Sequence, residues 1–155
     1  MVNNIISTQN GKGLCLDIKN IYLNNPLPGP EYMKIHISMI PQEIIDQYNL
    51  EILKGDKGWC SMRIEKGVYG LKQAGIIANN ELQKYFKPYG YAPVRYTPGL
   101  WECKGRYTMF TLVVDDFLVK INSEECAQHL INALKGKYEI TIDWDAKLYI
   151  GVTLK

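Results

Sequence analysis

The sequence carries almost no net charge of either sign. Its 18 Lys and Arg residues nearly balance its 16 Asp and Glu residues, which leaves +2 at pH 7, so no overall positive field announces a nucleic-acid partner. The longest apolar runs are far too short to span a bilayer, and the N-terminus lacks the basic, apolar and small-residue order of a signal peptide. We therefore expect an intracellular protein of the cytoplasm or nucleus that does not bind a membrane.

Cysteine is scarce and irregularly spaced. The four residues Cys15, Cys60, Cys103 and Cys126 lack the paired spacing of a zinc site, so we expect reduced thiols in the core. No internal repeat or low-complexity tract is present. With 155 residues, 46% of them apolar and 22% charged, the sequence has the composition of a globular protein and is long enough for one domain with its own core.

Apolar periodicity predicts an α+β fold. Short apolar or alternating segments predict strands over 14–18, 33–37, 59–64, 100–103, 107–114, 117–121, 138–142 and 148–154. Helical spacing predicts helices over 41–48 and 72–87, and another that begins after Ser123 as its N-cap. We expect the proline-rich segment 24–30 to break the chain between elements and residues 1–12 to be a loose lead-in. This order is typical of an antiparallel sheet with helices on one face, as in ferredoxin-like and RRM-like domains.

Three aspartates carry the strongest chemical signal. Asp115 and Asp116 separate two apolar strand-like runs, which places them at the tip of a β-hairpin, although two acids also suit an ordinary solvated turn. Asp17 lies in another apolar run, where an ionised carboxylate costs several kcal/mol unless a cation or hydrogen bonds compensate it. If the two strands lie side by side, Asp17 and Asp115 meet. Carboxylates that converge without Cys or His suit Mg²⁺ or Mn²⁺, and two such ions roughly 4 Å apart can serve phosphoryl transfer.

Three motifs in order resemble a known family. The segment Asp17-Ile18-Lys19-Asn20-Ile21-Tyr22-Leu23-Asn24 resembles motif A of the reverse transcriptases of copia-like LTR retrotransposons. Val68-Tyr69-Gly70-Leu71-Lys72-Gln73-Ala74 resembles their motif B, and Leu112-Val113-Val114-Asp115-Asp116 resembles their motif C. Leu148-Tyr149-Ile150-Gly151-Val152 resembles the strand that follows motif C. The resemblance spans nearly the whole chain, roughly 14–154.

The resemblance implies a polymerase palm with a defined set of site residues. It implies that Asp17 and Asp115 hold two Mg²⁺ or Mn²⁺ ions and that Asp116 is the third carboxylate. It places Tyr22 beneath the sugar of the incoming nucleotide, where the ring can exclude a 2′-hydroxyl. It places Gln73 over the nucleotide's sugar and the template pair, with Lys72 near a phosphate at the start of a helix. Read without the resemblance, Tyr22 is equally a packed tyrosine and Lys72 a solvated charge.

The resemblance also implies partners. They are a primer–template nucleic acid, RNA or DNA, and deoxynucleoside triphosphates. Gly151 marks the start of the hairpin that grips the primer, and an isolated glycine in a strand also fits a simple bulge. An exposed last strand could pair with a second copy, which predicts a homodimer.

The domain organisation implied by the resemblance is incomplete. We expect a single palm-like domain over residues 1–155, with the fingers region largely absent and the thumb and RNase H domains absent. Because orientation of the reactants contributes several orders of magnitude to rate, we expect this chain alone to polymerise inefficiently. The alternative is a non-catalytic nucleic-acid-binding or structural remnant of a palm. A ferredoxin-like metal enzyme of another class shares the carboxylates but leaves the run Tyr69 to Gln73 unexplained.

Overall fold

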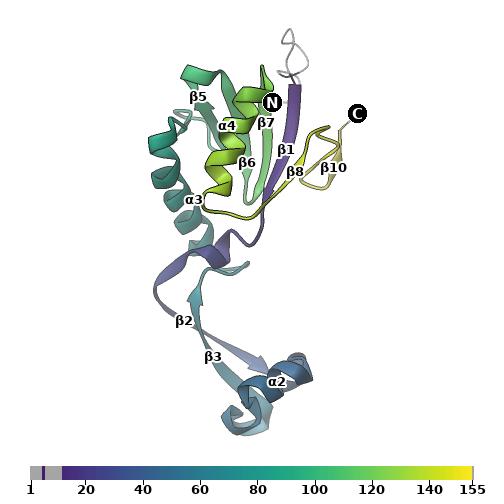
Figure 1. The fold of residues 1–155 in the computed structure, drawn as a ribbon. Coiled ribbons are helices and arrows are strands. Elements are labelled where there is room, and N and C mark those ends of the chain that lie inside the picture. Colours follow the sequence, from purple (N-terminus) through teal and green to yellow (C-terminus); the bar gives the residue numbers. More distant parts are fainter. Residues whose placement is uncertain (1–4, 6–11, 155) are drawn as a thin grey trace.

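A six-stranded antiparallel sheet forms the body of the molecule. The computed structural model describes Ile5 and residues 12–154, so most of the predicted lead-in, 1–12, lies outside the described residues. The strands lie in the order β4-β5-β6-β7-β1-β8 (Figure 1). Their bounds are Ala92–Pro93 (β4), Leu100–Cys103 (β5), Thr108–Val113 (β6), Asp116–Ile121 (β7), Lys12–Ile18 (β1) and Ile140–Asp143 (β8). The motif A and motif C strands, β1 and β7, are therefore neighbours at the centre of the sheet.

Two helices cover one face of this sheet. They are α3 (Lys72–Phe86) and α4 (Glu124–Lys135), and Ser123 caps α4 as predicted, with its hydroxyl accepting from the Cys126 backbone N–H at 3.3 Å. Alternate residues of β1 and β7 point toward the helices and are buried with them in one apolar cluster. The predicted α+β fold, an antiparallel sheet with helices on one face, is confirmed.

Aromatic rings fill the middle of that cluster. Trp101 of β5 and Phe110 of β6 are cross-strand partners, and their rings stack at 5.6 Å between centroids. Phe86 from the end of α3 and Phe117 from β7 each contact Phe110, at 5.9 and 5.1 Å. Each of these side chains is at most 2% exposed. Because a buried large side chain contributes about 1.5–3 kcal/mol, this group fixes β5, β6, β7 and α3 to one another.

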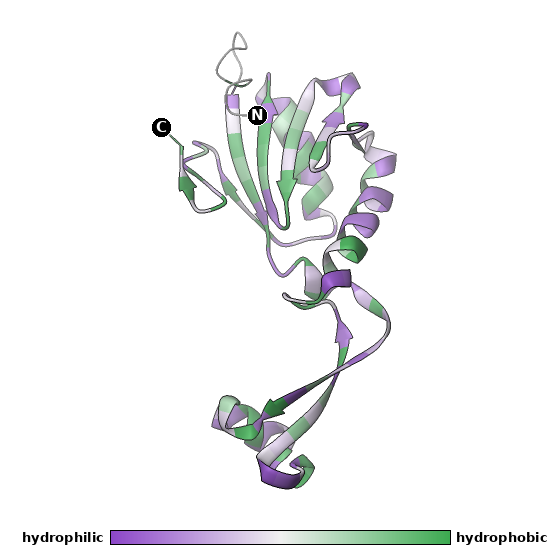
Figure 2. Cartoon of the chain, turned by 180° about the vertical axis from the view of Figure 1, so that it is seen from behind, coloured by the Kyte–Doolittle hydropathy of each residue, from purple (hydrophilic) through white to green (hydrophobic). Residues whose placement is uncertain are grey.

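A two-stranded ribbon projects away from the sheet. It consists of β2 (Pro26–His36) and β3 (Trp59–Lys66), and its far end holds α2 (Gln42–Tyr48) and short 3₁₀ turns (Figure 1). The prediction that 24–30 breaks the chain is wrong, because β2 already begins at Pro26. The pairing jumps from Pro26↔Lys66 to Glu31↔Ile64, so the remaining prolines lie where the ladder is interrupted and their missing N–H groups cost no ladder bond. Hydrophobic and hydrophilic segments mix around α2 (Figure 2).

The chain ends in a tight hairpin rather than the single strand predicted for 148–154. Its strands are β9 (Leu148–Tyr149) and β10 (Val152–Thr153), and the two residues between them, Ile150 and Gly151, have φ values of +46° and +76°. Positive φ at both positions is the requirement of a type I′ turn. Gly151 is therefore a turn residue of the hairpin.

The cysteines follow the prediction made from their spacing. All four cysteines are free, and Cys15, Cys60 and Cys103 are buried, as predicted for core thiols. Within the part of the chain that the structure describes, no helix is long and apolar enough to cross a bilayer.

Candidate active site

The three predicted carboxylates lie together at one end of the central strands. Val113 pairs with Asp116 across the β6–β7 hairpin, so Val114 and Asp115 form its two-residue turn. Asp17, near the end of β1, is the cross-strand partner of Asp116. The backbone carbonyl of Asp115 accepts from the Ile18 N–H at 3.0 Å. The predicted hairpin tip is confirmed, and the predicted meeting of Asp17 with Asp115 differs by one residue, since Asp116 is the direct partner.

Asp17 and Asp116 belong to the sheet face that the helices leave uncovered. Cross-strand partners in an antiparallel pair point to the same face, so Asp17 and Asp116 share one. Cys15 and Leu118, two residues from each along their strands, lie on that face in a small cluster with Ala146 and Tyr149. The three aspartates are half-buried. They are therefore partly shielded from water yet open to a ligand.

The turn that carries Asp115 is strained. Val114 has a φ of +61°, a left-handed conformation that the crowded Cβ of a β-branched residue strongly disfavours. Its side chain is 46% exposed, so burial compensates little of this cost. Strained non-glycine backbone of this kind is concentrated at functional sites.

Electrostatic repulsion links the three carboxylates. Burial raises the pKa of Asp116 above its ordinary value, and the charges of Asp115 and Asp17 raise it further. Burial also raises the pKa of the neighbouring Cys15 thiol to about 11, with added contributions from Asp143 and Asp116. A positive ion placed among these groups would relieve the repulsion.

Two tyrosines border the carboxylates. Tyr22, in the 3₁₀ turn Tyr22–Asn24 after β1, contacts Tyr69 edge-on with 4.8 Å between ring centroids. The Tyr69 hydroxyl donates to Asp115 Oδ2 at 2.5 Å. This bond, followed by burial and the Asp115 charge, raises the pKa of Tyr69 to about 12, while burial and the same charge raise the pKa of Tyr22. Both hydroxyls therefore stay protonated at neutral pH.

Sequence reasoning missed two neighbours of the site. Tyr69 is one of them, and its place beside Gly70 in the motif B segment is the sequence signal that could have identified it. Thr141 of β8 donates from its hydroxyl to Asp17 Oδ2 at 3.2 Å, and nothing in its local sequence marks it, because the pairing of β8 with β1 spans 124 residues.

The other predicted site residues belong to elements that do not carry the carboxylates. Lys72 and Gln73 begin α3; the Lys72 side chain is exposed, and Gln73 Nε2 donates to Glu31 Oε1 of β2 at 2.6 Å. Gly151 lies in the β9–β10 turn. That hairpin is tied to the sheet by a 3.0 Å hydrogen bond between the hydroxyls of Tyr149 and Thr111.

The donor chemistry of the site fits a hard divalent cation. Asp17, Asp115 and Asp116 offer only carboxylate oxygens, the ligands that Mg²⁺ and Mn²⁺ prefer, and their mutual repulsion favours a cation. Among Ile5 and residues 12–154, no three His, Cys, Asp or Glu side chains are already arranged to hold a metal ion. Two of the carboxylates are instead hydrogen-bonded to Tyr69 and Thr141.

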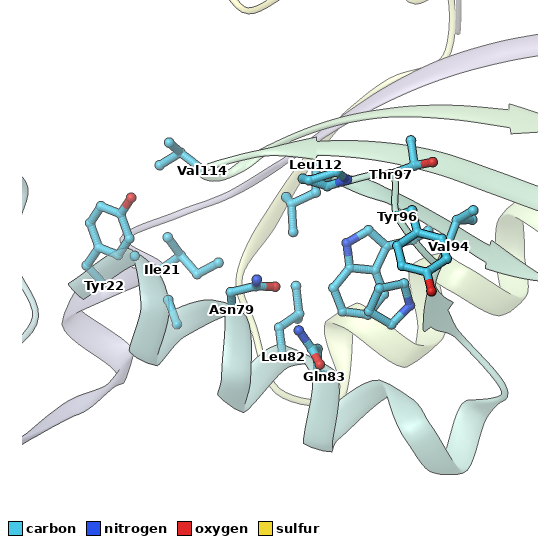
Figure 3. A pocket seen from close by; sticks show the side chains of 16 residues that line it. Ile21, Tyr22, Asn79, Leu82, Gln83, Val94, Tyr96, Thr97, Leu112 and Val114 are labelled. Carbon is cyan, nitrogen blue, oxygen red and sulfur yellow. The ribbon is translucent and has the colours of Figure 1, made fainter. Parts of the chain in front are cut away.

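A cavity of about 470 Å³ adjoins the site. Tyr22 and Val114 line one end of it, and Tyr96 lines the other, with Asn79 and Gln83 of α3 along one side (Figure 3). None of the three carboxylates is among its lining residues. The cavity is therefore a space beside the carboxylates rather than over them.

Comparisons with known proteins place the chain in a family. The family model described as reverse transcriptase (RNA-dependent DNA polymerase) matches residues 8–155. A retrovirus-related Pol polyprotein from transposon RE2 of Arabidopsis thaliana is 27% identical over 142 residues, which are 90% of this chain and 9% of that protein. The chain thus spans only a small part of this curated relative. A solved structure of apo telomerase from Candida tropicalis, truncated from the C-terminal domain, matches with a TM-score of 0.43 and 13% identity over 91% of this chain and 33% of that one. The chain belongs to the reverse transcriptase (RNA-dependent DNA polymerase) family, and the predicted resemblance to the reverse transcriptases of copia-like retrotransposons is confirmed.

Proposed function

We propose that this chain is the palm domain of a retrotransposon reverse transcriptase and takes part in template-directed transfer of deoxynucleotides to a primer 3′-hydroxyl. The observation that carries the proposal is the gathering of Asp17, Asp115 and Asp116 at one end of β1 and β7. The strained turn at Val114 and the raised pKa of Asp116 support it, because both features are typical of functional sites.

The proposed cofactor is a pair of divalent cations, which reverse transcriptases generally use. Asp17 and Asp115 would hold two Mg²⁺ or Mn²⁺ ions, with Asp116 beside them. When bound, the ions would supply positive charge to the attacking and leaving oxygens of an in-line displacement. The carboxylates' own part is to bind this charge and fix its position at the end of a rigid sheet.

The remaining residues are proposed to position substrates. The Tyr22 ring, beside the cavity, would lie beneath the sugar of a deoxynucleoside triphosphate and exclude a 2′-hydroxyl by contact. Lys72 would approach a phosphate, and Gln73 would reach the nucleotide only after its bond to Glu31 breaks. Gly151, in the turn of β9–β10, belongs to the proposed primer-gripping hairpin. The predicted intracellular location and homodimer stay predictions.

Primer extension tests the proposal. The chain is incubated with Mn²⁺, deoxynucleoside triphosphates and a labelled primer–template, beside the variants Asp115→Asn and Asp145→Asn. Asp145 is the matched control, because it is an exposed aspartate outside the site that pairs with Lys147 at 2.6 Å, and exposed pairs contribute little to stability. We expect extension by the unchanged chain and by Asp145→Asn, and a loss of about 100-fold or more in Asp115→Asn, since a bound metal supplies several kcal/mol of transition-state stabilisation.

The opposite outcome is equally informative. No extension by any of the three proteins would refute catalysis by this chain. Binding of the same duplex that is retained without metal, and unchanged by Asp115→Asn, would then assign the non-catalytic nucleic-acid-binding role. Affinity that falls steeply with salt would show that this binding uses phosphate contacts.

A further inference from the structure

Tyr69 is hydrogen-bonded to one of the two carboxylate oxygens of Asp115. Its hydroxyl donates to Asp115 Oδ2, and its ring makes a T-shaped contact with the Tyr22 ring. The Tyr69 residue is 61% exposed, so burial does little to hold it in place. These two contacts, both with residues of the candidate site, therefore account for its orientation.

Hydrogen bonding and cation binding compete for the same carboxylate oxygen. The Oδ2 lone pair that accepts the hydrogen bond from Tyr69 is not free for a metal ion, and a hard cation is bound through such oxygen lone pairs. The Tyr69 hydroxyl carries no charge that could replace the cation. A divalent ion that binds Asp115 through the Oδ2 lone pair used by Tyr69 therefore displaces the bond from Tyr69.

The segment that carries Tyr69 can permit this displacement. Tyr69 lies between β3 and α3, directly before Gly70, whose φ is +94° and whose missing Cβ faces open space. At the other end of the segment, Gly67 packs closely on the carbonyl of Tyr22. The Leu71 N–H donates to the Val68 carbonyl at 3.3 Å and closes a turn around Tyr69 and Gly70. Because this segment lies between β3 and α3, outside the six-stranded sheet, a swing of the Tyr69 side chain requires no rearrangement of that sheet.

We propose that Tyr69 is a latch that holds Asp115 when no metal is bound and is released when a divalent cation binds. This inference rests on the proposed metal site. Release also removes the ring contact between Tyr69 and Tyr22, so cation binding leaves the Tyr22 ring free to adjust to the nucleotide sugar. Tyr69 is in this sense a positioning residue that couples the loading of metal to the placement of the Tyr22 ring.

Calorimetric titration with Mn²⁺ in the absence of nucleotides tests the latch. The variant Tyr69→Phe keeps the ring and removes the competing hydroxyl, and Tyr32→Phe, at an exposed tyrosine of β2, is the matched control. We expect Tyr69→Phe to bind Mn²⁺ about five-fold more tightly, the size of one competing hydrogen bond, and Tyr32→Phe to bind as the unchanged chain does. Thermal unfolding of each variant verifies that it is folded.

Failure of the latch and failure of the metal site are distinguishable. Binding of Mn²⁺ to the unchanged chain, with equal or weaker binding to Tyr69→Phe, would overturn the latch and leave the metal site standing. No Mn²⁺ binding by any of the proteins would overturn both.

Hydrogen exchange gives a second, independent readout of the release step. Addition of Mg²⁺ should speed amide exchange in residues 67–71 of the unchanged chain and change it little in Tyr69→Phe, where the latch is already open. Slower exchange of this segment on addition of Mg²⁺ to the unchanged chain would contradict release.

Discussion

At position 114, glycine should give a more stable protein than alanine, although glycine is usually the less stable of the two. Val114 occupies the turn before Asp115 with a φ of +61°. Alanine keeps the Cβ that clashes in the left-handed region, at a cost of about 1–2 kcal/mol, whereas glycine adopts the conformation freely. Glycine also loses about 0.5–1 kcal/mol through the greater freedom of the unfolded chain. Together these effects leave Val114→Gly more stable than Val114→Ala by about 0.5–1 kcal/mol.

The adjacent residue provides a matched control. Val113 belongs to the same hairpin and is 46% exposed, as Val114 is, but its φ is not positive. At position 113 the usual rank should hold, with Val113→Gly less stable than Val113→Ala by about 0.5–1 kcal/mol. Because the unfolded-chain effect is the same at both positions, the difference between the two pairs isolates the cost of the left-handed conformation.

Urea unfolding of the four variants measures these differences. A change of 1 kcal/mol also shifts the thermal midpoint of a chain this size by about 2–4 °C. If alanine is the more stable residue at both positions, the hairpin turn does not impose a strained backbone at Val114. The strain would then lend no support to a functional site at this turn.

Two further predictions concern the surroundings of the carboxylates. The raised pKa of Asp116 means that ionisation of this carboxyl costs the folded state more than the unfolded chain, so the free energy of unfolding falls as pH rises through this titration. The variant Asp116→Asn should therefore stabilise the chain at pH 7 and not at pH 3. Equal urea midpoints for the variant and the unchanged chain at pH 7 would contradict this. A Cβ added at Gly67 would lie 2.9 Å from the carbonyl oxygen of Tyr22. Gly67→Ala should therefore lower the free energy of unfolding by about 1–3 kcal/mol and reduce primer extension, whereas Gly105→Ala, where a Cβ meets nothing within 4 Å, should change neither.

The elements that the sequence predicted well are those with strong local periodicity. The apolar stripe of α3 and the alternation of β1 both depend on residues a few positions apart, and both follow the predicted bounds closely. The ribbon strand β2 was predicted too short, because composition alone marks Pro26 as a breaker. Its extension depends on pairing with β3, whose partner residues are 23 to 40 positions away, and on an interruption of the ladder that no local pattern reveals.

In the candidate site, too, local sequence patterns were predictable and long-range contacts were not. Asp17, Asp115 and Asp116 were predictable, because acids beside apolar strands are conspicuous and the motifs fix their order. The exact register was not, because a shift of one residue decides whether Asp115 or Asp116 faces Asp17, and that shift depends on the turn at Val114. Two further contacts depend on the direction in which the β2–β3 ribbon projects from the six-stranded sheet. They are the contact of Gln73 with Glu31 and that of Tyr69 with Asp115.

The β2–β3 ribbon gives the molecule two levels of cooperativity. The six-stranded sheet shares one apolar cluster with α3 and α4, so these elements unfold as a unit. Within the described residues, the far end of the ribbon has as its buried apolar side chains only Ile45, Leu50 and Cys60, and a two-stranded ribbon is marginally stable by itself. Because the free energy of local opening follows the density of buried contacts, the far end opens at small cost while the sheet stays intact. The carboxylates, at the ends of the central strands, are thereby insulated from the fluctuations of the most easily opened part of the chain.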